Sequence, residues 1–156
     1  MKNVVAFSHA LADETRWRIA LLIFSEPMCV CELADILGMP QSSVSSHVQV
    51  IKKAGILESE KREKWIYYRL SPGHRHLVMM LAEFFNASPA WDSVLKADAS
   101  RAQVRLAERE ESCCPLPQGL KKLKAPAFKA RPGSNTKIKT QAKKPSSKTQ
   151  PPKARA

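Results

Sequence analysis

The sequence lacks the features of a membrane protein, a secreted protein and a phosphate-binding enzyme. Its longest apolar run, Ile19 to Phe24, is far shorter than the roughly 20 residues that cross a bilayer. The first residues show no apolar signal-peptide core followed by a small-residue cleavage site. Glycine is scarce, with 5 residues in 156, and no glycine-rich phosphate loop or paired nucleophile and base is present. These absences predict a cytoplasmic protein that is not an enzyme and keeps its cysteines reduced.

Acidic residues are missing from the last part of the chain. Segment 1–112 holds 14 Lys or Arg and 14 Asp or Glu, whereas segment 113–156 holds 12 Lys or Arg and no acid. The formal net charge of +12 therefore belongs to the C-terminal segment. From Pro115 on, Pro, Lys, Ser, Thr and Gln dominate, and such a composition cannot bury enough apolar surface to fold alone. We predict a folded domain over 1–112, and a cysteine pair followed by a disordered basic tail over 113–156.

Helical periodicity dominates the first third of the chain. Apolar residues recur at about 3.6-residue spacing, Asp13 is a helix-start residue, and Gly38 to Pro40 are turn residues. Ser42 or Ser43 is expected to cap the helix after this turn. Two helices joined by a short turn that contains glycine make a helix-turn-helix motif. The predicted helices run over about 4–11, 13–25, 30–37 and 42–54.

A small β-hairpin and further helices are predicted after this motif. Residues 65–70 are aromatic and β-branched, which favours a strand, and an extended piece starts at Ile56. Residues 60–64 would form the tip of this wing. The following helix, through Phe85, is apolar on more than one stripe, so we expect it to pack against a partner subunit as well. Segment 90–111 is also compatible with a helix. The predicted fold class is mainly α with a small β-hairpin: a winged helix-turn-helix.

The helix over 42–54 has a narrow apolar face and a polar outer face. At 100° per residue, Val44, Val48 and Ile51 fall within about 40° of one another. Serines, a glutamine and a lysine point outward, and these side chains can read base edges or contact phosphates in a major groove. An ordinary solvated face is the alternative, but serine is a mediocre helix former. The predicted DNA-binding residues are Gln41, Ser42, Ser43, Ser45, Ser46, His47, Gln49 and Lys53, with Lys61, Arg62 and Lys64 of the wing.

Two cysteine pairs lie on either side of these elements. Cys29 and Cys31 lie at the start of the helix-turn-helix with one valine between them, and Cys113 and Cys114 are adjacent. Thiolates at such spacing can chelate a soft metal, whereas small core residues are the alternative for the first pair. Adjacent cysteines rarely form a relaxed disulfide with each other. The second pair is therefore either incidental or a source of further metal ligands.

Three segments in order, ALADETRWRIALLI, CVCELADILGMPQSSVSSHVQVIKKAGIL and KWIYYRLSP, resemble the arsenic-responsive repressor family, ArsR/SmtB. The resemblance implies a homodimer that occupies double-stranded operator DNA until a toxic metal or metalloid binds. It also implies that the thiolates of Cys29 and Cys31 are ligands of As(III) or Sb(III). The chain departs from the family in two places, because Ala34 stands where a third cysteine is typical and Glu63 replaces a frequent wing glycine. His74 and His76 are expected in a loop rather than in a zinc site.

The resemblance suggests a switch that starts at the first cysteine pair. Residues i and i+2 of a helix do not face each other, so binding both sulfurs to one ion would distort the first turn of the helix over 30–37. Cys113 or Cys114, from the same or the other subunit, could supply the third ligand or form a second site. Three alternatives stay open: a thiol redox-sensing regulator of the same fold, a sensor of another thiophilic metal such as Cd(II), and an architectural DNA-binding protein dominated by its basic tail.

Overall fold

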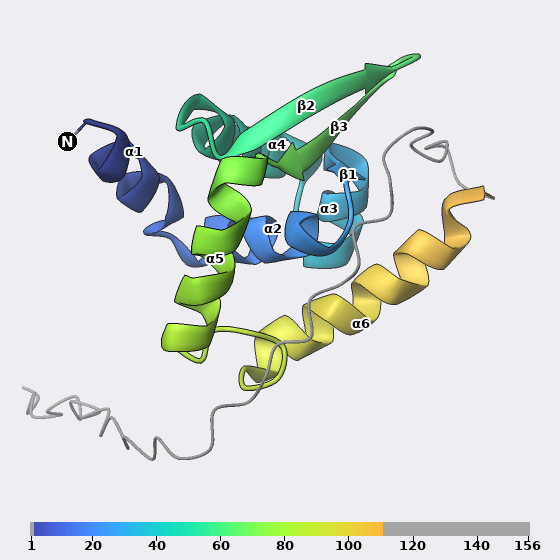
Figure 1. Cartoon of the computed structure of the whole chain (residues 1–156). Helices are drawn as coiled ribbons and strands as arrows, with labels where there is room; N and C mark the ends of the chain where they lie inside the picture. The colour runs from blue at the N-terminus through green and yellow to red at the C-terminus, as the bar shows by residue number, and fades with distance from the viewer. Residues whose placement is uncertain (1, 111–156) are drawn as a thin grey trace, which may run out of the picture.

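The computed structural model describes residues 2–110, in which α-helices combine with a three-stranded antiparallel sheet (Figure 1). Among these residues, no helix has the length and apolar character that crossing a bilayer requires. The strand order is β1-β3-β2. In chain order the elements are α1 (Lys2–Leu11), α2 (Glu14–Ser25), β1 (Met28–Cys29), α3 (Val30–Leu37), α4 (Gln41–Lys53), β2 (Leu57–Arg62), β3 (Trp65–Leu70), α5 (Pro72–Phe84), α6 (Ser93–Ala107) and the short 3-10 helix η1 (Glu108–Glu110).

The predicted fold class is confirmed, and local sequence signals explain most element ends. Asp13 caps α2, because its carboxylate accepts the backbone N–H of Arg16 at 2.9 Å. Gly38 ends α3 in the left-handed conformation with φ of 65°, which glycine adopts at little cost. The helix-turn-helix therefore consists of α3, this glycine turn and α4.

The structure differs from the predictions at β1 and at the start of α4. Met28 and Cys29 form a strand, which pairs with β3. Pro40, and neither Ser42 nor Ser43, precedes the first turn of α4, because its carbonyl already accepts the N–H of Val44 at 3.1 Å.

The structure also differs from the predictions in the wing and in α5. Residues 60–62 continue β2 as far as the pairing of Arg62 with Trp65, so the turn is only two residues long. Its first residue, Glu63, has φ of 52°, the left-handed conformation that glycine adopts without strain. His74 and His76 lie in the first turns of α5 and not in a loop, because Pro72 starts this helix after Ser71.

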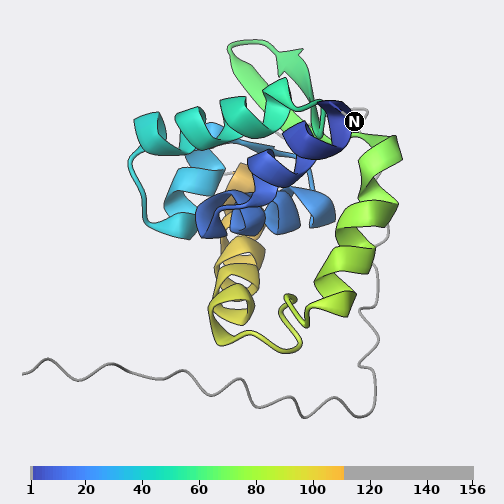
Figure 2. The same cartoon turned by 90° about the vertical axis from the view of Figure 1, so that its left-hand side faces the viewer.

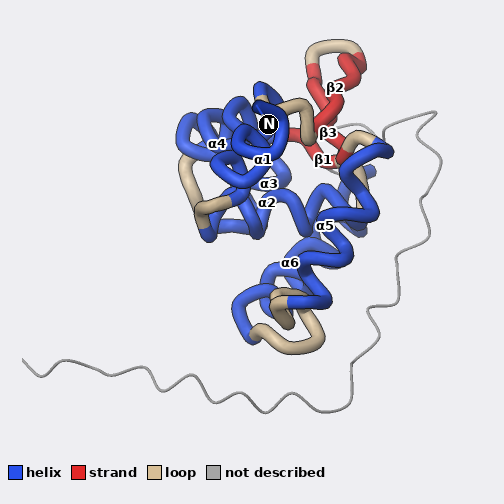
Figure 3. Tube along the Cα trace, turned by 60° about the vertical axis from the view of Figure 1, so that its left-hand side comes forward, coloured by secondary structure: helices blue, strands red, loops and turns tan. Residues whose placement is uncertain are grey.

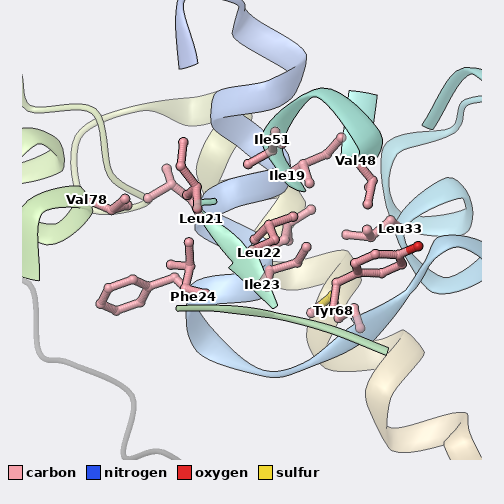
Figure 4. Close-up of a cluster of buried hydrophobic side chains, with 14 of the residues drawn as sticks. Ile19, Leu21, Leu22, Ile23, Phe24, Leu33, Val48, Ile51, Tyr68 and Val78 are labelled. Atoms are coloured by element: carbon pink, nitrogen blue, oxygen red, sulfur yellow. The ribbon is translucent and has the colours of Figure 1, made fainter. Parts of the chain in front are cut away.

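Helix α2 is the centre of the hydrophobic core. It contacts α1, α4, α5, α6 and β3, and its six consecutive residues 19–24 are all buried. A helix that is covered on all sides needs such a continuous apolar run rather than one stripe. Figure 4 shows the side chains of α2 packed with Leu33 of α3 and with Val48 and Ile51 of α4. The tip of the hairpin of β2 and β3 and the start of helix α6 lie at opposite ends of the molecule (Figures 2 and 3).

Candidate DNA-binding face and thiol site

The outer face of α4 is polar and open to solvent. Val44, Val48 and Ile51 are fully buried, as their spacing predicts. Opposite them, Ser42, Ser46, Gln49 and Lys53 are exposed, together with Gln41 at the start of the helix. The hydroxyl of Ser46 donates to the carbonyl oxygen of Ser42 at 3.0 Å, so it is held close to the helix surface and does not obstruct an approaching ligand.

The remaining predicted residues of α4 lie on its flanks. Ser43, Ser45 and His47 are half-buried. The Nδ1 atom of His47 lies 3.6 Å from a carboxylate oxygen of Asp13, the residue that caps α2. His47 therefore faces the start of α2, and a direct contact with DNA is less accessible to it than to Ser46 or Gln49.

Tyr68 of β3 connects α4 to the hairpin. The side-chain amide of Gln49 donates to the Tyr68 hydroxyl at 3.5 Å, and the ammonium group of Lys52 lies 5.9 Å from the centre of the Tyr68 ring. Burial raises the pKa of the Tyr68 hydroxyl above its ordinary value, and the bond from Gln49 opposes this rise. Lys52 and Tyr68 were not among the predicted residues, and Lys52 could have been found as an exposed cation on the same helix.

The basic residues of the wing differ in what they contact. The guanidinium group of Arg62 pairs with Glu60 of the same strand, so part of its charge is neutralised. Lys64 is exposed and lies over the Trp65 ring, with 5.4 Å between its ammonium group and the ring centre. Lys61 is also exposed. The two lysines are therefore better placed for phosphate contacts than Arg62.

Cys29 and Cys31 lie where the sheet meets α3. Cys29 is opposite Tyr67 in the pairing of β1 with β3, and its backbone is extended, with φ of −87° and ψ of 167°. Cys31 lies in the first turn of α3. The i and i+2 helix geometry assumed for the two cysteines therefore does not apply, because Cys29 precedes α3 in an extended conformation. The exposed fractions of the two residues are 2% and 6%, and they cluster with Tyr67 and Trp65.

A buried ion pair stands beside the cysteines. The backbone N–H of Cys29 donates to the carboxylate of Glu32 at 2.9 Å, and Arg109 of η1 donates to the same carboxylate at 2.6 and 3.2 Å. Arg109 also donates to the carbonyl oxygen of Pro27 at 2.5 Å. Glu32 is 0% exposed and Arg109 is 5% exposed. The pair was not predicted, because the two residues are 77 positions apart and no local pattern relates them.

Three arginines spaced four residues apart hold the last helical segment against α3. Arg101 donates to the carbonyl oxygen of Ile36 at 2.6 Å, and Arg105 donates to the carboxylate of Asp35 at 2.9 Å. Arg109 completes the series at Glu32, at the start of the same helix. Residues four apart lie on one helix face, so the series follows α3 from its end to its beginning.

The cysteine pair has no complete metal site within the described part of the chain. Among residues 2–110, no group of three or more His, Cys, Asp or Glu side chains is arranged to hold a metal ion. Cys29 and Cys31 form no disulfide with another described residue. The other predicted ligands, Cys113 and Cys114, and the predicted disordered tail lie outside the described residues. Two thiol donors are therefore in place, and a third remains a prediction.

Helices α1 and α5 expose large apolar side chains on the outside of the molecule. The two helices are joined by the stacking of Phe7 on His74, with 5.6 Å between the ring centres. The exposed fractions of the apolar side chains lie between 40% and 70% for the following residues: Val4, Val5, Leu77, Met80 and Phe84.

Comparisons with known proteins agree with this architecture. Residues 13–59 match the family described as bacterial regulatory protein, arsR family. The chain is similar to the arsenic resistance transcriptional regulator ArsR1 of Pseudomonas putida, with 39% identity over 104 residues, which are 65% of this chain and 78% of that protein. It is also similar to the arsenical resistance operon repressor of Escherichia coli, with 45% identity over 64 residues, which are 40% of this chain and 54% of that protein.

Solved structures show the same fold. A homodimeric winged helix-turn-helix DNA-binding domain from Mycobacterium bovis matches with a TM-score of 0.53 and 23% identity, covering 55% of this chain and 80% of that one. Sequence matches also include a cadmium resistance transcriptional regulatory protein from Listeria innocua, with 34% identity over 42% of this chain and 56% of that protein.

Proposed function

The chain belongs to the ArsR family of bacterial regulatory proteins, and from this premise we propose that it is a cytoplasmic repressor released from operator DNA when its cysteines bind As(III) or Sb(III). The observation that supports this proposal is the position of the two buried cysteines, which lie between α3 and β3, a strand of the wing. Any change at the thiols has a short path to both DNA-contacting elements. The relatives named for arsenic resistance support the choice of inducer.

In this proposal α4 enters the major groove and the wing follows the backbone. Ser46 and Gln49 would contact base edges, and Lys53, Lys61 and Lys64 would contact phosphates. Gln41, Ser42, Ser45 and Lys52 surround this centre. The contact of Gln49 and Lys52 with Tyr68 keeps the helix and the wing in one orientation, so both can reach the same duplex.

The donor set fits a soft metalloid. Thiolate sulfur is preferred by soft ions, and the surroundings of Cys29 and Cys31 are largely apolar. When bound, As(III) would supply a small centre that three sulfurs can share. Movement of Cys29 toward Cys31 would pull on the pairing of β1 with β3, and movement of Cys31 would strain the start of α3. Coupling of about 1–3 kcal/mol between the two sites would weaken DNA binding by roughly 5- to 150-fold.

The third thiolate is proposed to come from Cys113 or Cys114. Arg109 is held at Glu32 and Pro27, next to Cys29. Cys113 follows Arg109 by four residues, so its Cα atom lies within about 14 Å of the Arg109 Cα atom by chain length alone. The same subunit can therefore supply this ligand without a contribution from a second one.

We propose that a second copy covers the exposed apolar faces of α1 and α5. Large apolar side chains on two adjacent helices are typical of an obligate interface rather than of a monomer surface. The homodimeric state of the similar Mycobacterium bovis domain supports this choice.

The test is operator binding with and without As(III), measured under anaerobic conditions with excess reductant. We expect wild-type protein to release DNA, and Cys29→Ser and Cys31→Ser to bind DNA normally but to stay bound. Normal release by both variants would exclude the thiol switch. The double variant Cys113→Ser/Cys114→Ser should respond to As(III) only at higher concentrations, whereas an unchanged response would make these residues incidental thiols.

The redox-sensor alternative is distinguished by the same experiment, because disulfide formation would not occur in excess reductant. Burial of Cys29 and Cys31 also disfavours it, since redox-sensing thiols are typically accessible. The alternative of a Cd(II) sensor is favoured by the cadmium resistance relatives and needs a comparison of the two inducers.

A further inference from the structure

The hydroxyl group of Tyr68 is held in place beside the outer face of α4. Tyr68 lies in the middle strand β3, where it is paired with Met28 of β1 and with Ser59 of β2, and it is 4% exposed. Figure 4 shows its ring among the buried side chains of the core. Burial raises the pKa of the hydroxyl, so the group stays protonated at neutral pH. A rigid, uncharged hydrogen-bonding group therefore stands next to the exposed residues of α4.

Gln49 is the residue of α4 that contacts this hydroxyl. Its side chain is exposed, and its Nε2 atom donates to the Tyr68 hydroxyl oxygen, with 3.5 Å between the two atoms. One amino hydrogen is used in this bond, so the carbonyl oxygen and the second amino hydrogen are left for an incoming ligand. A long side chain that is already oriented loses less conformational entropy on binding than one that rotates freely.

The remaining edge of the Gln49 amide matches adenine better than the other bases. In the major groove adenine presents the N6 donor next to the N7 acceptor, and a glutamine carbonyl oxygen and amino hydrogen pair with both. Cytosine offers only its N4 donor, whereas guanine and thymine present acceptors, which repel the carbonyl oxygen. The opposite orientation of the amide, with its oxygen toward Tyr68, would present two amino hydrogens to the groove and would favour guanine.

We propose that Tyr68 is a positioning residue that orients Gln49 to select adenine at one position of each operator half-site. Tyr68 acts through Gln49 and does not itself contact a base. This inference rests on the proposed function, because it requires that α4 enters the major groove. It adds to that function the base that Gln49 selects and the residue that makes the selection possible.

The test uses full-length protein and a library of duplexes of randomised sequence, from which the wild type is expected to enrich an operator. Base discrimination is then measured as the ratio of affinities for duplexes that differ at a single base pair. Affinity for a random-sequence duplex at the same salt concentration measures non-specific binding. Thermal unfolding shows which variants are folded.

Four variants are compared with the wild type: Gln49→Ala, Tyr68→Phe, the double variant Gln49→Ala/Tyr68→Phe, and Tyr67→Phe. Phenylalanine at position 68 keeps the ring that Lys52 contacts and removes only the hydroxyl. Tyr67→Phe is the matched control, because it removes a hydroxyl from the neighbouring residue of β3, whose side chain faces the other side of the sheet.

We expect the variants to differ in base discrimination and not in non-specific affinity. Gln49→Ala should lower the preference for adenine at one position by roughly 5- to 150-fold, the amount that one bidentate contact provides. Tyr68→Phe should lower it at the same position by about 2- to 10-fold, because the amide must then be ordered when DNA binds. The double variant should match Gln49→Ala, since Tyr68 acts only through Gln49, and Tyr67→Phe should match the wild type.

Several results would overturn the inference. Guanine at the position that Gln49→Ala affects would mean that the amide has the opposite orientation, and this result does not depend on the folding of any Tyr68 variant. Unchanged discrimination in Tyr68→Phe, or an equal loss in Tyr67→Phe, would mean that the Tyr68 hydroxyl only supports the fold. Failure of the wild type to enrich any sequence would instead refute operator binding, and with it the proposed function itself.

Discussion

The two ends of the molecule use basic side chains differently. Next to α6, each of Arg18, Arg101, Arg105 and Arg109 contacts a carboxylate on another turn or element. On α4, Lys52 and Lys53 are exposed, and none of the lysines whose side chains the structure describes, all within residues 3–110, takes part in an ion pair. The wing holds both kinds of basic side chain, because its arginines pair with glutamates while Lys61 and Lys64 do not.

This difference separates cations that hold the fold from cations that are available to a partner. A buried arginine that is already hydrogen-bonded to a carboxylate cannot neutralise a phosphate. The positive potential of an exposed lysine that is not paired with a carboxylate extends into the solvent and attracts the DNA backbone. The net charge of segment 1–112 is zero and conceals this separation. The positions of the carboxylate partners therefore say more about DNA binding than the net charge does.

The largest expected effect is the loss of the buried carboxylate of Asp98. It accepts hydrogen bonds from Arg18 at 2.7 and 2.9 Å and also contacts Arg101, and the bond raises the pKa of Arg18 above its ordinary value. Asp98→Ala would leave the Arg18 charge poorly compensated. We expect it to lower the free energy of unfolding by about 3–5 kcal/mol in urea denaturation. A decrease below about 1 kcal/mol would show that α6 contributes little to stability.

The next effect is on DNA binding by α4. Ser46→Glu should weaken operator binding by about 100-fold, because it places a carboxylate against base acceptors and phosphates. Ser100→Glu is the matched control, because Ser100 is an exposed serine on α6 whose hydroxyl also donates to the carbonyl four residues earlier, at 3.1 Å. Equal affinities of the two variants in a mobility-shift assay would show that α4 is not the recognition helix.

The basic segment after residue 114 should have a smaller effect. Removal of residues 115–156 takes away every uncompensated positive charge of that segment and should reduce non-specific DNA affinity, while sequence preference is kept by α4. For each phosphate that the segment neutralises, its removal should flatten the slope of log affinity against log salt by about 0.9. Identical salt slopes for full-length and truncated protein would mean that this segment does not contact DNA.

The smallest effect is expected for the exposed pair of the wing. Glu58→Ala removes the partner of Arg69, which lies at 2.6 Å, but both side chains are more than 40% exposed. Such pairs contribute about 0–1 kcal/mol, so unfolding should be nearly unchanged. The freed arginine should increase DNA affinity slightly at low salt. A destabilisation as large as that of Asp98→Ala would contradict the distinction between the two ends.

Local patterns were sufficient for most of the fold. The spacing of Val44, Val48 and Ile51 predicted the buried face of α4, and Gly38 predicted the turn before it. The strand β1 was missed because two residues cannot show a period. The start of α4 was placed too late because the carbonyl of Pro40, a residue without an N–H group, accepts the first helical bond.

The sequence by itself determined the type of each surface: a polar outer face on α4, a wing, an apolar α5 and a cysteine pair at the start of the helix-turn-helix. These follow from period, spacing and side-chain chemistry, which are properties of neighbouring residues. Only the tertiary structure decided which charges are neutralised and what surrounds the two cysteines. Arg109 meets Glu32, and Cys29 meets Tyr67, because α6 and β3 return to the start of α3. Such contacts depend on how the core around α2 packs, and no pattern within one segment specifies them.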